Sequence, residues 1–551
     1  MSLRCEPIGP VPEETSRVAH AAFPKGNLYM RLKDALGIIY QDVAFAPLFP
    51  TRGRPAEAPW RLALVTVMQF AENLSDRQAA DAVRSRIDWK YTLGLELSDP
   101  GFDHTVLCAF RDRLVEGGAQ QALLDLLLER CKTLGLLKAR GTQRTDSTLV
   151  LGAARGLSRL ALVRETMHHT LESLARVAPD WLREQADPQW VERYQQRFPS
   201  ELPRGKEGQR VLAETIGQDG AQLLQKIYAS NGPPWLREVA AVEVLRQVWV
   251  QNYWQSAGES RWRTEVEGLP PSARFISSPY DLDTHYSRKG TSSWIGYKVH
   301  LTETCDEELP HLITHVETTT APTADGEVTA KAHEALQQGG LLPAVHLVDT
   351  GFLNAQLLVE SQRHYGVELL GPTRRTRRWQ TRAGDGFGLD KFVLDFQGRK
   401  AICPEGKESQ EWVPRVDNRR NDSIYIRFSS SDCGPCPSRE KCTKSKAKYP
   451  RRSLTVRPQE QYQALKLRRE QEETASYQLA YSKRAGIEGT ISQGVRAMGM
   501  RRSRYLGLIK THLGHVVTAA AINLVRVGEW LAGTPRATTR QSKFAAVMLG
   551  Q

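Results

Sequence analysis

Two short segments, each with one aspartate, constrain the fold of this chain most. Residues 344–351 are mainly apolar up to Asp349 and then reach a glycine, the pattern of a buried strand that opens into a tight turn. Residues 141–150 also have the pattern of a strand, and they carry Asp146. With the helical patterns elsewhere in the chain, these strands predict an α/β protein.

A third acidic residue, Glu488, stands where a helix is expected to begin. Carboxylates from two strands and one helix can meet although they are far apart in sequence, and their oxygens suit Mg²⁺. Two such ions can activate a water or a 3′-hydroxyl and stabilise the leaving oxygen at a phosphodiester. Asp281 and Asp283 compete with Asp146 as the first ligand. They precede a strand, and we interpret them as turn residues.

Three motifs resemble the signature regions of DDE transposases from bacterial insertion sequences. They are Thr145-Asp-Ser147, Val348-Asp-Thr-Gly-Phe352 and Tyr481-x-x-Arg484-x-x-x-Glu488, and residues 102–114 and 294–300 are also typical of that group. Each motif is weak alone, but their order and joint presence over most of the chain make the resemblance strong. In one departure, Val495 stands where the related signature often has a basic residue, and Arg496 follows one position later.

The resemblance implies a ribonuclease-H-like core whose first and fourth strands lie side by side. Asp146, Asp349 and Glu488 would then be the catalytic residues and would hold two Mg²⁺ ions. Periodicity alone predicts the order strand, strand, strand, helix, strand, helix, strand and then the helix of Glu488. Within it, residues 294–304 and 311–320 are expected to form a hairpin.

Large insertions are expected to interrupt this mixed-sheet core. The predicted layout is a flexible arm (1–25), a helical N-terminal DNA-binding domain (26–135), the core (136–154 and 275–371), a helical insertion (155–274), a basic and cysteine-containing insertion (372–455), the C-terminal part of the core (456–531) and a disordered basic tail (532–551).

The charge of the chain favours a polyanionic partner. Lys and Arg exceed Asp and Glu by 75 − 62 = 13, and the pI is near 9.3. Tyr481 and Arg484 are expected to follow the DNA backbone if one helix runs through them to Glu488. The alternative for Arg484 is an ion pair with Glu488. Further predicted DNA contacts, with a solvated charge run as the alternative, are Arg374, Arg375, Arg377, Arg378, Arg496, Arg501 and Arg502.

Helices near the N-terminus have the pattern of a helix-turn-helix-like DNA reader, with a packing bundle as the alternative. Ser75-Asp-Arg-Gln78 has the spacing of a capping box. The arginines expected on their polar sides are Arg77, Arg84, Arg86, Arg111 and Arg113.

Four cysteines between residues 403 and 442 predict a structural zinc site. Cys433 and Cys436 form a C-x2-C pair, and Cys403 and Cys442 complete a set of four thiols. The alternative is four reduced cysteines without metal.

The sequence therefore predicts a Mg²⁺-dependent DNA transposase that acts on double-stranded DNA, both at terminal inverted repeats and at a target. We expect a homo-oligomer, because two ends must be cut together, and a cytoplasmic, nucleoid-associated protein without a membrane partner. Residues 516–525 are expected to form a buried helix, since they cover only about half of a membrane span. The alternatives are a catalytically idle, transposase-derived DNA-binding protein and a different nuclease on the same core.

Overall fold

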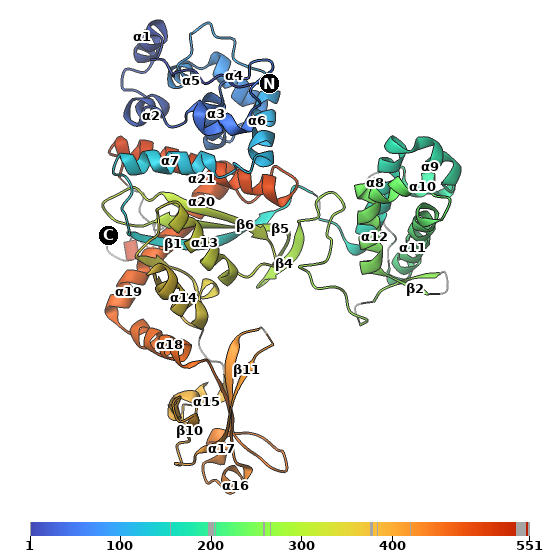
Figure 1. Cartoon of the computed structure of the whole chain (residues 1–551), viewed down its shortest axis with the longest axis vertical. Helices are drawn as coiled ribbons and strands as arrows, with labels where there is room; N and C mark the ends of the chain where they lie inside the picture. The colour runs from blue at the N-terminus through green and yellow to red at the C-terminus, as the bar shows by residue number, and fades with distance from the viewer. Residues whose placement is uncertain are drawn as a thin grey trace. The chain divides into compact units, whose positions relative to one another are not determined.

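A computed structural model describes every residue except 1, 155, 197–202, 204, 257, 258, 265, 375–377, 383, 419, 536–546 and 549–551. It is a mixed α/β structure with many helices (Figure 1). The chain divides into two compact units. The first contains Met1–Lys138, Ser147–Thr323 and Glu488–Gln551, and the second contains Ala139–Asp146 and Ala324–Ile487.

The N-terminal part of the first unit is helical. Helix α4 begins with the predicted capping box, because the Ser75 side chain accepts from the amide of Gln78 while the Gln78 side chain accepts from the amide of Ser75. The elements are α1 (Glu13–Ala22), α2 (Leu28–Leu36), η1 (Asp42–Leu48), α3 (Pro59–Ala71), α4 (Asp76–Ser85), α5 (Ile87–Leu93), α6 (Thr105–Glu116) and α7 (Ala122–Thr133).

Helix α21 (Leu508–Leu531) is the central helix of the first unit and packs against α2, α3, α7 and the strand β6. It is longer than the apolar run at residues 516–525 suggests. By length and composition it is the one described helix that could cross a membrane, but 72% of its apolar window is buried inside the protein. That burial is what a core helix requires, as the sequence predicted for residues 516–525.

The strands of the first unit confirm the predicted hairpin. β5 (Ser292–Thr304) and β6 (Ile313–Thr320) pair antiparallel, and β4 (His285–Lys289), which the sequence did not reveal, pairs with β5. The last part of β1 (Thr142–Leu151) approaches β5 closely at Gly296. A Cβ on this glycine would lie 2.2 Å from the Val150 carbonyl oxygen, and its φ of +150° also excludes most side chains.

The segment between β1 and β4 forms a helical cluster with its own apolar core, which includes Trp190, Leu223, Leu245 and Trp249. An unexpected hairpin of β2 and β3 follows the last helix. The elements are α8 (Arg159–Val177), α9 (Pro179–Gln185), α10 (Gln189–Tyr194), α11 (Lys206–Tyr228), η2 (Pro234–Glu238), α12 (Ala240–Asn252), β2 (Tyr253–Ser256) and β3 (Glu259–Trp262).

In the second unit, the beginning of β1 pairs in parallel with β7 (Val345–Leu347), and β7 pairs in parallel with β8 (Glu368–Leu370). β7 is the fourth strand of the predicted core order, so the expected neighbourhood of first and fourth strands is observed. Helices α13 (Gly326–Gln338) and α14 (Ala355–Tyr365) lie before and after β7 in sequence, as the periodicity predicted.

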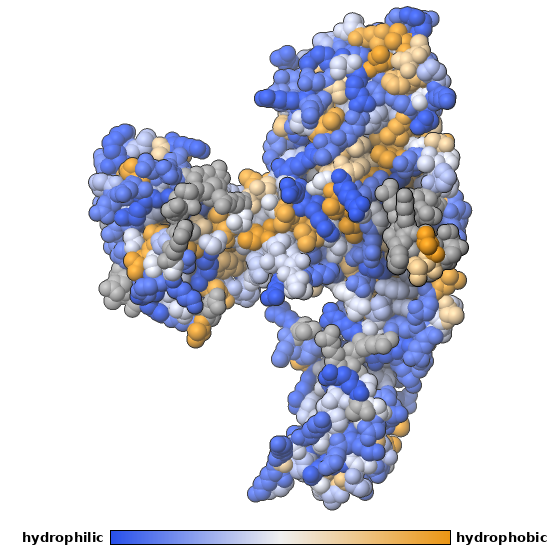
Figure 2. Space-filling view, turned by 180° about the vertical axis from the view of Figure 1, so that it is seen from behind, coloured by the Kyte–Doolittle hydropathy of each residue, from blue (hydrophilic) through white to orange (hydrophobic). Residues whose placement is uncertain are grey.

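Residues 384–456, which we call the cysteine lobe, belong to the second unit and have a separate small core around Phe392, Ile426, Phe428 and Leu454. The lobe lies at the bottom of Figure 1, and its surface in Figure 2 is mainly hydrophilic. Its elements, which the sequence did not indicate, are η4 (Leu389–Lys391), β9 (Val393–Asp395), β10 (Lys400–Ile402), β11 (Ser409–Val416), β12 (Asp422–Phe428), α16 (Ser430–Cys433), α17 (Arg439–Cys442) and β13 (Ser453–Val456).

The third motif does not lie on one continuous helix. Such a helix is the condition under which Tyr481 and Arg484 are expected to follow the DNA backbone together with Glu488. After α18 (Gln459–Glu472), the chain forms α19 (Ala475–Ser482), the 3₁₀ turn η5 (Lys483–Ala485) and α20 (Gly486–Met498). Tyr481, Arg484 and Glu488 therefore lie on three successive short elements, and the 3₁₀ turn changes the direction in which Arg484 projects.

Candidate active site

The pairing of β1 with β7 determines where two of the predicted carboxylates lie. Thr142 is opposite Val345, and the register continues to Arg144 opposite Leu347. The same register, extended by two residues, brings Asp146 opposite Asp349. Neighbouring strands lie about 4.8 Å apart, so two side chains at equivalent positions can share one ligand.

Asp349 stands at the start of a tight turn directly after β7. Its Oδ1 accepts a hydrogen bond from the amide of Thr350 at 2.7 Å, and the carboxylate is half-buried. Gly351 allows the turn to pack closely, because a Cβ there would lie 3.1 Å from an oxygen of Asp325. The predicted glycine turn is thus confirmed, and it leaves Asp349 at the end of the strand.

Asp146 lies within β1, which continues for five residues beyond it, so it does not end a strand. Its Oδ2 accepts from the Arg484 guanidinium at 2.8 Å, and the two side chains are 16% and 13% exposed. An ion pair of Arg484 was expected, as an alternative, with Glu488. The structure also pairs Arg484 with Asp146, a partner that the sequence did not suggest.

Arg144 connects β1 to the third motif in a second way. Its buried guanidinium donates to the carbonyl of Lys483. It also lies against Gly486, where a Cβ would come within 2.1 Å of Nη1. The structure gives a reason for the glycine at the start of α20, because only a residue without a side chain leaves room for Arg144.

Tyr481 is half-buried near both carboxylates. Burial raises the pKa of its phenol, the guanidinium of Arg484 lowers it, and the charges of Asp349 and Asp146 raise it further. Its ring stacks on Tyr477 with centroids 5.8 Å apart. The structure therefore gathers Asp146, Asp349, Tyr481 and Arg484 in the second unit.

Glu488 is exposed in the first turn of α20 and is the first residue of the last segment of the first unit. Within that unit, α20 is held by a buried polar cluster. Thr490 donates to the fully buried Glu303 at 2.6 Å, and Arg526 donates to Glu303 at 2.8 Å and to Thr490 at 2.7 Å. A buried carboxylate needs such partners, so this helix is firmly anchored two residues after Glu488.

The competing acids have structural partners in the first unit. Both oxygens of Asp281 accept from the Tyr297 hydroxyl at 2.7 Å, and burial raises the pKa of this carboxyl. Asp283 accepts from the amide of Leu508 at 2.8 Å. His300 in β5 and His346 in β7 are buried.

Across the described residues, no three His, Cys, Asp or Glu side chains converge as a group that could hold a metal ion. None of the eight cysteines forms a disulfide in the part of the chain that the structure describes. Cys403, Cys433, Cys436 and Cys442 line one pocket in the cysteine lobe. Burial raises the pKa of Cys442 to about 11, to which the other three thiols contribute. The four cysteines therefore share a pocket, as the spacing suggested, without being drawn together as a set of ligands.

Among the basic residues predicted to contact DNA, Arg374, Arg378, Arg496, Arg501 and Arg502 are exposed. Arg501 donates to the Thr148 hydroxyl at 2.8 Å and so lies along the last part of β1 within the first unit. Arg375 and Arg377 lie outside the described residues, as do Arg536, Arg540 and Lys543 of the predicted basic tail.

Most arginines expected to read DNA from the N-terminal helices are engaged within the protein. Arg86 pairs with Glu72 and Asp88, and Arg84 pairs with Asp81. Arg113 donates to the Leu48 carbonyl at 3.3 Å. Sequence periodicity assigned these side chains to a polar face, but it does not reveal the acidic partners on that face.

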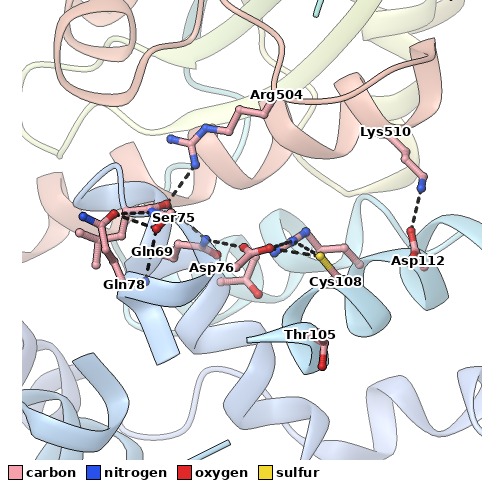
Figure 3. A network of polar contacts seen from close by, with 12 residues as sticks. Gln69, Ser75, Asp76, Gln78, Thr105, Cys108, Asp112, Arg504 and Lys510 are labelled. Atoms are coloured by element: carbon pink, nitrogen blue, oxygen red, sulfur yellow. Dashed lines mark hydrogen bonds and ion pairs between the residues drawn. The ribbon is translucent and has the colours of Figure 1, made fainter. Parts of the chain in front are cut away.

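Arg111 is nearly fully buried and donates to Asp76 at 2.6 Å. Figure 3 shows Arg504 beside the start of α4 and Lys510 directed at Asp112, to which it donates at 2.8 Å. Basic residues from the C-terminal segment therefore hold α4 and α6, and the sequence alone does not predict this interaction.

Two protein families match the chain. The family described as Transposase domain (DUF772) matches residues 17–113, and the family described as Transposase DDE domain matches residues 402–528. No curated protein and no solved structure matches the chain. The second family implies an enzyme of DNA cleavage and transposition. Together with the three motifs, the two matches support a DDE transposase of the insertion-sequence type.

Proposed function

We propose that this transposase has a ribonuclease-H-like core that cuts the ends of an insertion sequence and joins the released 3′-hydroxyls to target DNA. The observation that carries the proposal is the parallel register of β1 and β7, which pairs Arg144 with Leu347 and, extended by two residues, would bring Asp146 opposite Asp349. Tyr481 and Arg484 of the third motif lie beside this pair and are suited to a phosphate backbone.

Asp146, Asp349 and Glu488 would hold two Mg²⁺ ions, which would supply the activation of water or a 3′-hydroxyl and the stabilisation of the leaving oxygen. The donor chemistry fits, because Mg²⁺ prefers carboxylate oxygens. Glu488 enters this set through its motif alone. Arg484 would orient the Asp146 carboxylate through its hydrogen bond and neutralise a nearby phosphate.

The DNA partners would be the terminal inverted repeats and the target duplex. When arginines neutralise phosphates, they release the counterions bound to the DNA. The affinity of the protein for DNA should therefore fall steeply as the salt concentration rises. The nine residues proposed to contact DNA are Tyr481, Arg484, Arg374, Arg375, Arg377, Arg378, Arg496, Arg501 and Arg502. A homo-oligomer would hold two ends together, and a DNA substrate fits a cytoplasmic, nucleoid-associated protein.

We also propose a structural zinc ion in the cysteine lobe. One backbone amide is directed at the thiols, since Lys407 donates to Cys403 Sγ at 3.4 Å. Amide donors of this kind stabilise thiolate sulfur, which is the form that binds zinc. The thiols would have to move together on binding, and metal analysis of the purified protein tests this.

The decisive experiment is cleavage of DNA that carries the flanking sequences of the gene, with Mg²⁺ present. Asp349→Asn removes one proposed ligand charge and should lower the cleavage rate by about 100-fold or more while DNA binding persists. The matched control is Asp180→Asn, the same change on a carboxylate that is 87% exposed in the helical cluster.

Defined nicks made by the wild type and by Asp180→Asn, but not by Asp349→Asn, would support the proposal. Equal cleavage by both variants would overturn the assignment of Asp349. Specific binding without any cleavage would instead favour a catalytically idle DNA-binding protein. Cleavage without strand transfer would favour a nuclease on the same core.

A further inference from the structure

A chain of three buried polar side chains lies between the two carboxylate-bearing strands and helix α13. The Thr145 hydroxyl lies 2.6 Å from His346 Nε2, and His346 Nδ1 lies 2.8 Å from His333 Nε2. The three side chains are 2%, 1% and 0% exposed. Thr145 precedes Asp146 in β1, and His346 lies in β7 three residues before Asp349.

We infer that Thr145, His346 and His333 are positioning residues that fix the register of β1 against β7, and thereby hold Asp146 opposite Asp349. The inference deepens the proposed function and rests on it, since it requires both carboxylates to serve one metal site.

The direction of these hydrogen bonds follows from His333, the last of the three side chains. Among the described residues, His333 Nδ1 has no hydrogen-bond partner. A buried nitrogen that carries a proton loses more without a partner than a bare nitrogen does, so the proton of His333 belongs on Nε2. His333 then donates to His346 Nδ1, and His346 donates from Nε2 to the hydroxyl of Thr145. Burial lowers the pKa of His333 to about 4, which keeps this imidazole neutral near pH 7.

Register matters here because a slip of one residue between parallel strands would turn every side chain to the other face. Apolar neighbours tolerate small shifts, whereas a hydrogen bond between strands is lost when its partners separate. Alternation puts Thr145 on the face of β1 opposite to Arg144 and Asp146. One face of β1 thus carries the candidate metal ligand and the contacts to the third motif. The other face carries Thr145, which is hydrogen-bonded to His346.

The test is Mn²⁺ binding to the full-length protein without DNA, measured by calorimetry and by the loss of the free-ion electron paramagnetic resonance signal. Thr145→Val keeps the shape and removes the acceptor for the His346 N–H, and it should weaken Mn²⁺ binding by about tenfold. Thr145→Ser restores the hydroxyl and should recover most of the affinity. Thr66→Val, which removes an equally buried hydroxyl in α3, should leave binding unchanged.

Asp349→Asn separates this inference from the proposed function. If it binds Mn²⁺ as well as the wild type does, the metal role of the carboxylate pair fails, and the inference fails with it. If Asp349→Asn loses affinity but Thr145→Val does not, the carboxylate site stands and the positioning role is overturned. Should Thr145→Val fail to fold, His346→Phe, which keeps a ring and removes both hydrogen bonds, is measured instead with the same two outcomes.

Discussion

The β1–β7 pair and the cysteine lobe bring reactive side chains together by different means. In the strand pair, backbone register and buried polar contacts put Asp146 and Asp349 at equivalent positions. In the lobe, Cys433 and Cys442 end two four-residue helices, and Cys403 and Cys436 lie in loops. Residues on neighbouring strands stay close without a ligand, whereas thiols on short helices and loops depend on whatever fills the space between them.

This difference has an energetic consequence. The strand pair belongs to a unit in which β7, β8, α13 and α14 bury one another. Among the described residues, the core of the lobe has six buried apolar side chains. A core of that size rarely supports a fold without a metal or a disulfide, and the cysteines form no disulfide.

If the proposed zinc ion holds the lobe together, its removal should give the largest effect. Structural zinc contributes on the order of 10 kcal/mol to small domains, so chelation or Cys442→Ser should release β11–β13 to rapid hydrogen exchange while β7 and β8 stay protected. Cys5→Ser, the same change at an exposed thiol, is the control. If the amides of the lobe exchange as slowly without metal as with it, the lobe does not depend on a metal, and the proposed difference between the two regions is wrong.

The second largest effect is a loss of stability at low pH, which is expected for the strand region and not for the lobe. The pKa of His333 is lowered from 6.5 to about 4, so the unfolded chain binds more protons between these values. Stability is full above about pH 6.5 and falls as the pH drops to about 4, by about 3 kcal/mol for this group. The lobe, residues 384–456, contains no histidine.

His333→Leu should remove that part of the acid dependence, which is measured as the difference in unfolding free energy between pH 7 and pH 4.5. The exchange of lobe amides should not respond to the substitution. An unchanged pH slope in His333→Leu would show that this histidine is not held neutral in the folded protein.

The sequence predicted the elements that follow from local residue patterns. It did not predict contacts between side chains that are far apart in sequence. The strands of Asp146 and Asp349, the hairpin after Trp294 and the capping box at Ser75 follow from periodicity and turn residues. The partner of Arg484 does not, because it lies 338 positions away in the sequence. The lobe was recognised only by its cysteines and charge, since its strands are short and its residues mainly polar.

A smaller effect is expected from Gly486→Ala, which tests the contact of β1 with the third motif. The new Cβ would meet the Arg144 guanidinium at 2.1 Å, and overpacking of a buried site costs about 1–3 kcal/mol. Gly489→Ala in the same helix meets nothing within 4 Å among the described residues, so it should stabilise α20 by up to about 1 kcal/mol. Thermal unfolding of both variants measures the contrast, and equal melting temperatures would contradict it.

The smallest effect compares two arginine–carboxylate pairs, one from each region. Arg484 pairs with Asp146 beside the strands, and Arg427 pairs with Glu411 across two strands of the lobe. If Arg484 also neutralises a phosphate, Arg484→Gln should reduce the slope of log affinity against log salt by about one. Arg427→Gln should leave that slope unchanged and cost at most about 1 kcal/mol of stability. Equal slopes for the two variants would mean that Arg484 serves only to hold Asp146, which would confine the DNA path to the other exposed arginines.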